Sequence, residues 1–188
     1  MDRPSVAQLN EELERTKKQE QKSRSIGHGF WVLIVVAAVA FLIASFFVSV
    51  IQVSGHSMEN TCSDGDILIV LRRMKPKDGD ITAFYYNNSI MLKRVIATTG
   101  ETVDIDDEGT VTVNGQNFGE PYVINKSKEG CDIELPLQVP EERYFLLGDN
   151  RKISVDSRSS TIGCVSDGDI LGRVVFRVWP LSRFGLVY

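Results

Sequence analysis

Residues 81–97, Ile-Thr-Ala-Phe-Tyr-Tyr-Asn-Asn-Ser-Ile-Met-Leu-Lys-Arg-Val-Ile-Ala, hold two β-rich runs separated by a short polar stretch. Gly, Asp and Asn separate further runs of this kind, at residues 67–70, 102–105, 110–113, 143–147 and 170–179. Asn114-Gly115 is typical of a hairpin turn. No amphipathic helix of useful length follows Val53. We therefore expect residues 53–188 to form an all-β domain of short antiparallel strands.

An apolar stretch from about Phe30 to Ile51 precedes this domain. As a helix, its roughly 22 residues would span ~33 Å, enough to cross the hydrocarbon core of a bilayer. The charges that flank it are basic before (Arg15, Lys17, Lys18, Lys22, Arg24) and acidic after (Glu59, Asp64, Asp66). The positive-inside rule then predicts a single-pass cell-membrane protein, with a cytoplasmic tail over residues 1–28, a transmembrane helix over 29–52 and an extracytoplasmic domain over 53–188.

A cleaved secretory signal is the alternative interpretation of this N-terminal region. Its apolar core would be shorter, ~7–15 residues, and would end at a small-residue cleavage site. Here the apolar run ends in the bulky sequence Val50-Ile51-Gln52-Val53, which favours a retained anchor. The formal net charge of −4 shows no basic excess, so we expect no nucleic-acid partner.

Two further patterns could suggest metal binding but have simpler explanations. Copies of Asp-Gly-Asp-Ile begin at Asp64, Asp78 and Asp167. They lack the spacing of a twelve-residue calcium loop and are better explained as tight turns. The cysteines are Cys62, Cys131 and Cys164, with no C-x-x-C pair to hold zinc. One disulfide with a free thiol, or three small buried thiols, both remain open. We expect no metal and no cofactor.

Ser57 is a candidate nucleophile, and neither histidine of the chain suits it as a base. Serine is a poor nucleophile unless a base takes its proton. His28 lies at the cytoplasmic end of the expected anchor. His56 is the immediate neighbour of Ser57, and adjacent side chains of an extended segment point to opposite faces. A Ser-His-Asp triad is therefore not expected.

Lys93 is the candidate base. Burial in apolar surroundings lowers the pKa of a lysine, because desolvation disfavours the ammonium form. On a strand, Lys93 would share one face with Met91 and Val95, while Arg94 would point away. Taken singly, a loop serine at position 57 and a surface lysine at position 93 would be ordinary features, so the wider pattern has to decide.

Four segments resemble the sequence boxes of type I signal peptidases, the membrane-anchored Ser/Lys proteases that remove secretory signal peptides. They are Val-Ser-Gly-His-Ser-Met-Glu-Asn-Thr at 53–61, Gly-Asp-Ile at 79–81, Leu-Lys-Arg-Val-Ile-Ala-Thr-Thr-Gly-Glu-Thr-Val at 92–103, and Gly-Asp-Asn-Arg-Lys-Ile-Ser-Val-Asp-Ser-Arg-Ser-Ser-Thr-Ile-Gly at 148–163. Their order, their spacing and the preceding anchor all match. The resemblance covers about residues 30–180, and the last segment is highly specific.

The resemblance implies a role for each matched residue. Ser57 corresponds to the nucleophile that forms an acyl-enzyme, with its own backbone N–H helping to form the oxyanion hole. Lys93 corresponds to the general base, and Ser154 to a serine that hydrogen-bonds and orients the lysine. Two supporting ion pairs are implied, Asp156 with Arg158 and Asp149 with Arg94. Met58, close to the nucleophile, is a plausible wall of a substrate pocket, with simple core packing as its alternative.

The sequence differs from the usual family pattern at Asn60, and it differs from some members of the family at Gly55. Asn60 stands where the family usually has proline, which would stiffen the loop around Ser57. Some members place an oxyanion-donating serine two residues before the nucleophile, whereas this chain has Gly55, as in members that lack the hydroxyl.

The expected function is a membrane-anchored serine endopeptidase that cleaves signal peptides with small residues before the cut. Its expected partners are secretory precursors, membrane lipid and the translocation machinery. A self-cleaving repressor would share the dyad and a related β fold, but it needs a DNA-binding helical domain where residues 1–52 supply an anchor. The eukaryotic secretory enzyme carries histidine at the position of Lys93. A catalytically impaired β domain that only binds signal peptides remains the alternative, and Asn60 is its only support.

Overall fold

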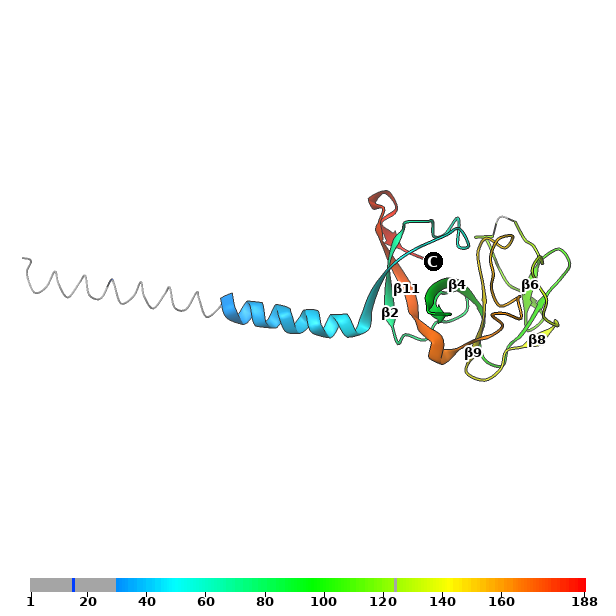
Figure 1. Cartoon of the computed structure of the whole chain (residues 1–188), viewed down its shortest axis with the longest axis horizontal. Helices are drawn as coiled ribbons and strands as arrows, with labels where there is room; N and C mark the ends of the chain where they lie inside the picture. Colours follow the sequence, from blue (N-terminus) through cyan, green and yellow to red (C-terminus); the bar gives the residue numbers. More distant parts are fainter. Residues whose placement is uncertain (1–14, 16–29, 124) are drawn as a thin grey trace, which may run out of the picture. The chain divides into compact units, whose positions relative to one another are not determined.

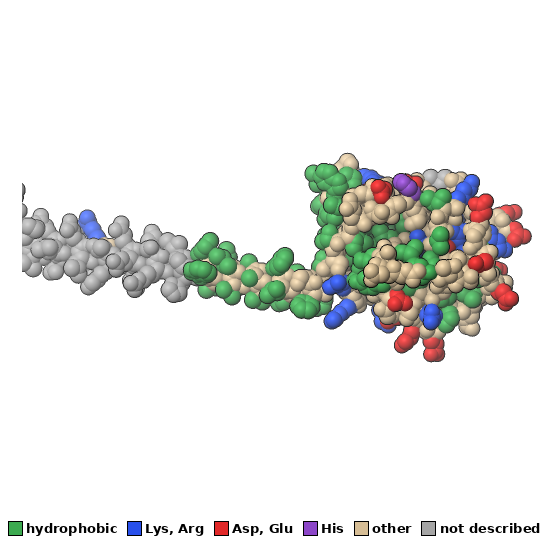
Figure 2. All heavy atoms as spheres, in the orientation of Figure 1, with side chains coloured by type: hydrophobic (Ala, Val, Ile, Leu, Met, Phe, Trp, Pro, Cys, Tyr) green, Lys and Arg blue, Asp and Glu red, His purple; other side chains and the backbone are tan. Residues whose placement is uncertain are grey.

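The computed structural model describes residues 15, 30–123 and 125–188. The chain divides into two compact units between Phe46 and Phe47. A helix over Phe30–Phe47 is long and apolar enough to cross a membrane, with a length of about 27 Å. Its hydrophobic side chains are exposed along its whole length (Figure 2). Apart from Arg15, the expected cytoplasmic tail over residues 1–28 lies outside the described residues.

The expected membrane span over residues 29–52 is divided between two elements. The helix ends at Phe47, and strand β1 (Val48–Gln52) begins with the next residue. β1 pairs antiparallel with β2 (Ile67–Arg72), with Val48 opposite Leu71 and Gln52 opposite Ile67. Val50 and Ile51 are β-branched and fit a pleated strand. Because they are also apolar, they continue the apolar run beyond the helix, and composition alone did not mark where the helix stops.

The second unit is built from two antiparallel sheets (Figure 1). The larger has the strand order β1-β2-β11-β3-β4-β9-β10, and β12 pairs with β11. Its remaining strands are β3 (Ile81–Tyr86), β4 (Ser89–Ala97), β9 (Arg143–Leu147), β10 (Val165–Ser166), β11 (Ile170–Trp179) and β12 (Gly185–Leu186). The smaller sheet has the order β7-β6-β5-β8, from β5 (Thr102–Ile105), β6 (Val111–Val113), β7 (Gln116–Asn117) and β8 (Leu137–Gln138). Short 3₁₀ turns lie at Asp167–Asp169 and Leu181–Arg183.

The predicted fold class is confirmed: the domain is antiparallel β structure that follows one apolar helix. Every β-rich run identified from the sequence is a strand, with ends that differ by two residues or fewer. Asn114 and Gly115 both take positive φ, 52° and 75°, as a tight hairpin turn requires, and they join β6 to β7. The strands that no β-rich run marked were β1, hidden inside the apolar run, and the short β7, β8, β10 and β12.

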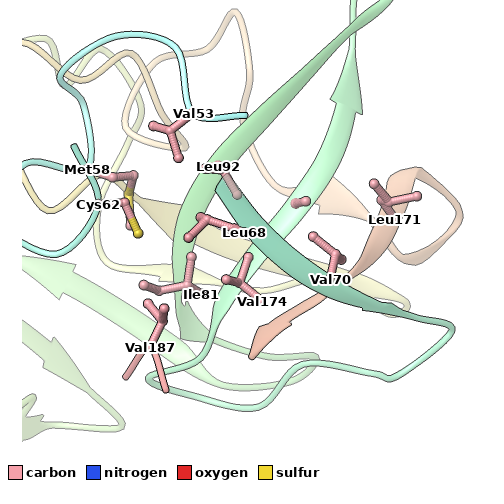
Figure 3. Packing of buried hydrophobic residues seen from close by; sticks show 11 residues of the cluster. Val53, Met58, Cys62, Leu68, Val70, Ile81, Leu92, Leu171, Val174 and Val187 are labelled. Carbon is pink, nitrogen blue, oxygen red and sulfur yellow. The ribbon is translucent and has the colours of Figure 1, made fainter. Parts of the chain in front are cut away.

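The main core of the larger sheet also holds residues of the loop that carries Ser57. Met58 and Cys62 are 1% and 0% exposed, and they pack in one cluster with Leu68 and Ile81 (Figure 3). A second cluster joins β4 and β9 to the smaller sheet. Apolar burial therefore fixes both ends of the Met58–Cys62 segment, directly after the candidate nucleophile.

The acidic repeats differ among themselves, and the cysteines are free. Gly65 and Gly79 both take φ of 84° in turns that feed β2 and β3, whereas Gly168 lies in a 3₁₀ turn. Turn formation therefore accounts for the first two repeats. All three cysteines are among the described residues and carry free thiols, so the disulfide left open by the sequence is not formed.

Candidate active site

Ser57 and Lys93 meet although 36 positions separate them in the chain. Ser57 lies in the loop between β1 and β2, and Lys93 lies in the middle of β4. The Lys93 Nζ donates a hydrogen bond of 2.8 Å to the Ser57 Oγ. β4 is an inner strand: Lys93 lies opposite Thr82 of β3, and the ladder with β9 begins at the next residue, Arg94. Among the described residues, the Lys93 amine makes no other hydrogen bond.

The amine of Lys93 is held in a site that disfavours its charge. The residue is 2% exposed. Burial lowers the pKa of Lys93 from 10.5 to about 8, while the negative charge of Asp156 raises it and the positive charge of Arg158 lowers it. An amine with this pKa is partly neutral near pH 8 and can accept a proton from a neighbouring hydroxyl.

Hydrogen bonds close the loop that carries Ser57. The Met58 carbonyl accepts from the backbone N–H groups of Thr61, at 3.1 Å, and Cys62, at 2.8 Å. The Ser57 carbonyl accepts from the Asn150 N–H at 3.0 Å, which joins the loop to the 148–163 segment. These bonds fix the backbone on both sides of the Ser57–Met58 peptide.

The two unusual loop positions, Asn60 and Gly55, both have positive φ. Asn60 has φ of 62°, a left-handed conformation that asparagine tolerates and that proline, fixed near −65°, cannot adopt. Asn60 therefore supplies a backbone conformation at this turn that proline could not. Gly55 has φ of 93°, where any side chain would be strained, and its N–H donates to Asp64 Oδ1 at 2.8 Å.

Arg94 lies beside Lys93 in β4 but in a different environment. Its Nε and Nη2 donate to the two carboxylate oxygens of Asp149 at 2.9 and 2.7 Å. Its Nη1 donates to the Gly79 carbonyl at 2.7 Å, and its guanidinium lies 3.8 Å from the ring centre of Tyr122. Burial opposes the charge of Arg94, but the hydrogen bonds and charge of Asp149 outweigh it and raise the pKa of the guanidinium.

Asp156 and Arg158 form the second predicted ion pair. Arg158 Nε donates to Asp156 Oδ1 at 2.8 Å, and the two side chains are 1% and 0% exposed. Asp156 Oδ2 also accepts from the Gly148 N–H at 3.0 Å. Gly148 is necessary here, because a Cβ would collide with the side chain of Ser154 and lie 2.7 Å from the Ser57 carbonyl oxygen.

Ser154 packs against Gly148 but makes no hydrogen bond to the Lys93 amine. Its Oγ is buried and has no hydrogen-bond partner among the described residues. The lysine-orienting bond expected from the family resemblance is therefore not formed in this structure, and the role of Ser154 stays a prediction. A buried hydroxyl without a partner is uncommon in native proteins.

Sequence reasoning missed an ion pair that supports the same segment. Arg151 donates to both carboxylate oxygens of Glu120, and the two side chains are 1% and 0% exposed. Arg151 Nε also donates to the Gly148 carbonyl at 3.1 Å. Arg151 stands inside the 148–163 segment and could have been suspected, whereas nothing in the local sequence marked Glu120.

A cleft of about 340 Å³ opens beside Ser57 and Lys93. Its walls come from β1 with the residues that follow it, Val50–Ser54, and from the first half of β4, Ile90–Lys93. Met58 also lines the cleft while 1% exposed, so it belongs to the wall and to the core together. Polar and apolar atoms both face the cleft.

Comparison with known proteins defines the class of this chain. The profile of the family described as signal peptidase, peptidase S26, matches residues 26–179. Signal peptidase IB of Staphylococcus aureus is 32% identical, with 82% of this chain and 91% of the relative covered. Signal peptidase I of Bacillus amyloliquefaciens is 31% identical, with 92% and 96% covered. The crystal structure of a signal peptidase I from Enterococcus faecalis aligns with a TM-score of 0.44 at 34% identity, over 53% of this chain and 96% of that one.

The family profile and the two relatives identify a hydrolase of the serine endopeptidase class. The chain belongs to the signal peptidase family, peptidase S26. The family resemblance inferred from the four sequence segments is thereby confirmed.

Proposed function

We propose that this chain cleaves signal peptides from secretory precursors by a Ser57/Lys93 dyad. The observation that carries the proposal is the 2.8 Å hydrogen bond between a buried Lys93 amine and the Ser57 hydroxyl. Membership in the signal peptidase family supports the substrate class, and the geometry supports the assignment of the two residues.

The reaction begins when the neutral Lys93 amine takes the proton of the Ser57 hydroxyl. The Ser57 oxygen attacks the scissile carbonyl, and the resulting ammonium of Lys93 gives its proton to the leaving amine. Collapse leaves an acyl-enzyme, and the same amine then activates a water that releases the signal peptide. Asp156, whose negative charge acts on Lys93, stabilises the ammonium while it exists.

The substrate would lie extended in the cleft between Val50–Ser54 and Ile90–Lys93. Alternate side chains of an extended peptide point to the same side. Small residues at alternate positions before the cut would therefore face the wall of the cleft near Met58. The charge asymmetry around the Phe30–Phe47 helix supports an orientation with the N-terminal tail cytoplasmic and residues 53–188 outside, and the length and apolar character of the helix support its retention in the membrane. Lipid and the translocation machinery would then be its neighbours.

The catalytically impaired alternative rested on Asn60. Asn60 has a backbone conformation that closes the turn, and the buried ion pairs around the site are complete, so little favours this alternative.

The test is cleavage of a precursor with an Ala-x-Ala site by the detergent-solubilised full chain. Ser57→Ala and Lys93→Ala should each lower the rate by more than ~10³-fold, because such groups act as a unit. Ser89→Ala and Lys77→Ala, at exposed positions, are matched controls and should retain the parental rate. Cleavage by Lys93→Ala at the parental rate would exclude the dyad.

A further inference from the structure

We propose that Thr61 is a positioning residue for Ser57, through which the Arg94–Asp149 ion pair fixes the nucleophile. The proposal rests on the function proposed for Ser57. Thr61 follows the nucleophile by four residues and lies at the end of the hydrogen-bonded turn.

The hydroxyl of Thr61 is bound by both members of the buried ion pair. Thr61 Oγ1 donates to Asp149 Oδ2 at 2.5 Å and accepts from Arg94 Nη2 at 3.2 Å. Arg94 and Asp149 are each 2% exposed and Thr61 is half-buried, so these are charge-assisted bonds to two buried charges. The hydroxyl therefore has a defined direction, with one bond given and one received.

The backbone of Thr61 is bound as firmly as its side chain. Its carbonyl accepts from Arg177 Nη2, and Arg177 forms an ion pair with Asp66 at 3.0 Å. Its N–H donates to the Met58 carbonyl at 3.1 Å. Thr61 thus links three charged side chains to the peptide group next to the nucleophile.

The same segment that binds Thr61 also binds Ser57. Asp149 contacts the Thr61 hydroxyl, and the next residue, Asn150, donates its N–H to the Ser57 carbonyl at 3.0 Å. The turn from Ser57 to Thr61 is consequently held at both ends by two adjacent residues of one segment. Between these two points, Met58 is buried in the core (Figure 3).

This arrangement explains how an ion pair that does not contact the reacting atoms would affect the reaction. The Ser57 Oγ must stay near the Lys93 Nζ and, at the same time, face the cleft. A displacement of the turn by about 1 Å can lower a catalytic rate on the order of 10²-fold. Loss of the Thr61 hydroxyl would release one end of the turn while the Ser57–Lys93 pair itself remained chemically intact.

The test compares Thr61→Val, Thr61→Ala and Thr61→Ser in the detergent-solubilised full chain. Thr61→Val keeps the shape of the side chain without its hydroxyl, and Thr61→Ala removes the same hydroxyl without placing a methyl group against Asp149. Both should lower kcat by about 10–100-fold with KM changed less than ~3-fold, because positioning is lost while the cleft is kept. Thr61→Ser retains the hydroxyl and should stay within ~3-fold of the parent.

The matched control is Thr98→Val. Thr98 Oγ1 donates to Glu101 Oε2 at 3.1 Å, so this variant also removes a hydroxyl–carboxylate bond, but in the turn after β4. It should leave kcat unchanged. Rates are taken at a temperature at which unfolding curves show each variant to be folded. If Thr61→Val does not fold, Thr61→Ala decides alone.

Two results would overturn the proposal for Thr61. One is a kcat for the hydroxyl-free variants equal to that of the parent, and the other is an equal loss in Thr61→Ser. If Ser57→Ala and Lys93→Ala abolish cleavage while Thr61→Ala does not impair it, only this inference fails. If the two dyad variants cleave normally, the proposed function itself fails.

Discussion

Lys93 and Arg94 are adjacent in β4 and equally buried, but their surroundings shift their pKa values in opposite directions. Arg94 has a carboxylate that accepts two of its hydrogen bonds, a backbone carbonyl and an aromatic ring. Lys93 has one hydroxyl at 2.8 Å. Burial lowers the pKa of Lys93 to about 8, whereas Asp149 raises that of Arg94. The partners of Arg94 keep it charged and part of the structure, whereas the pKa of Lys93 fits the general base that we propose.

The largest effect on stability should come from removing the partner of Arg94. Asp149→Asn keeps the shape of the side chain but leaves a buried guanidinium without a counter-charge. We expect the free energy of unfolding to fall by about 3–5 kcal/mol, as measured by denaturant unfolding in detergent. Asp107→Asn is the control, because Asp107 is 99% exposed in its ion pair with Lys128 and should change stability by less than ~1 kcal/mol. Equal effects of the two changes would contradict the assignment of Arg94 to structure.

At the neighbouring residue, Lys93, we expect a substitution to raise the free energy of unfolding. Lys93→Met removes a buried amine that has no counter-charge in contact with it, and should raise stability on the order of 1–3 kcal/mol at pH 7 while abolishing cleavage. The pKa of Lys93 is lower in the folded chain, about 8, than in the unfolded chain, near 10.5, so the unfolded chain binds more protons between these values. The gain should be complete below pH 8 and disappear as the pH rises from 8 to 10.5. A gain independent of pH would show that charge is not its cause.

The smallest effect, and the most specific, lies in the pH dependence of cleavage. Only neutral Lys93 can accept the serine proton, so kcat/KM should rise about tenfold per pH unit at low pH and level off around the pKa of about 8. The measurement is a pH–rate profile with a short Ala-x-Ala peptide. A midpoint near the ordinary lysine value of 10.5 would mean that the amine is not desolvated when it acts.

Much of the fold could be predicted because the strands have strong local signals. β3, β5, β9 and β11 occur at the residues expected, since runs of β-branched and aromatic residues lie between Gly, Asp and Asn. The end of the helix could not be found in this way, because the apolar run continues beyond it through Val48, Val50 and Ile51. Only pairing with β2 separates the two, and pairing partners lie far apart in the sequence.

The candidate site was predictable to the extent that it lies in the four matched segments. Those segments contain Ser57, Lys93 and both members of each expected ion pair, and the structure brings them together. Glu120 lies outside the segments, and its partnership with Arg151 depends on a loop returning to the sheet. The hydroxyl direction of Ser154 depends on packing against Gly148 at the level of single atoms, which no residue pattern encodes.

The absence of any spacer between Phe47 and Val48 limits how the enzyme could be made water-soluble. A shortened protein beginning at residue 53 would discard an edge strand, leave the hydrogen-bonding groups of β2 open to a second molecule, and remove part of one cleft wall. Removing the hydrophobic helix while keeping both walls of the cleft therefore means cutting no later than residue 47.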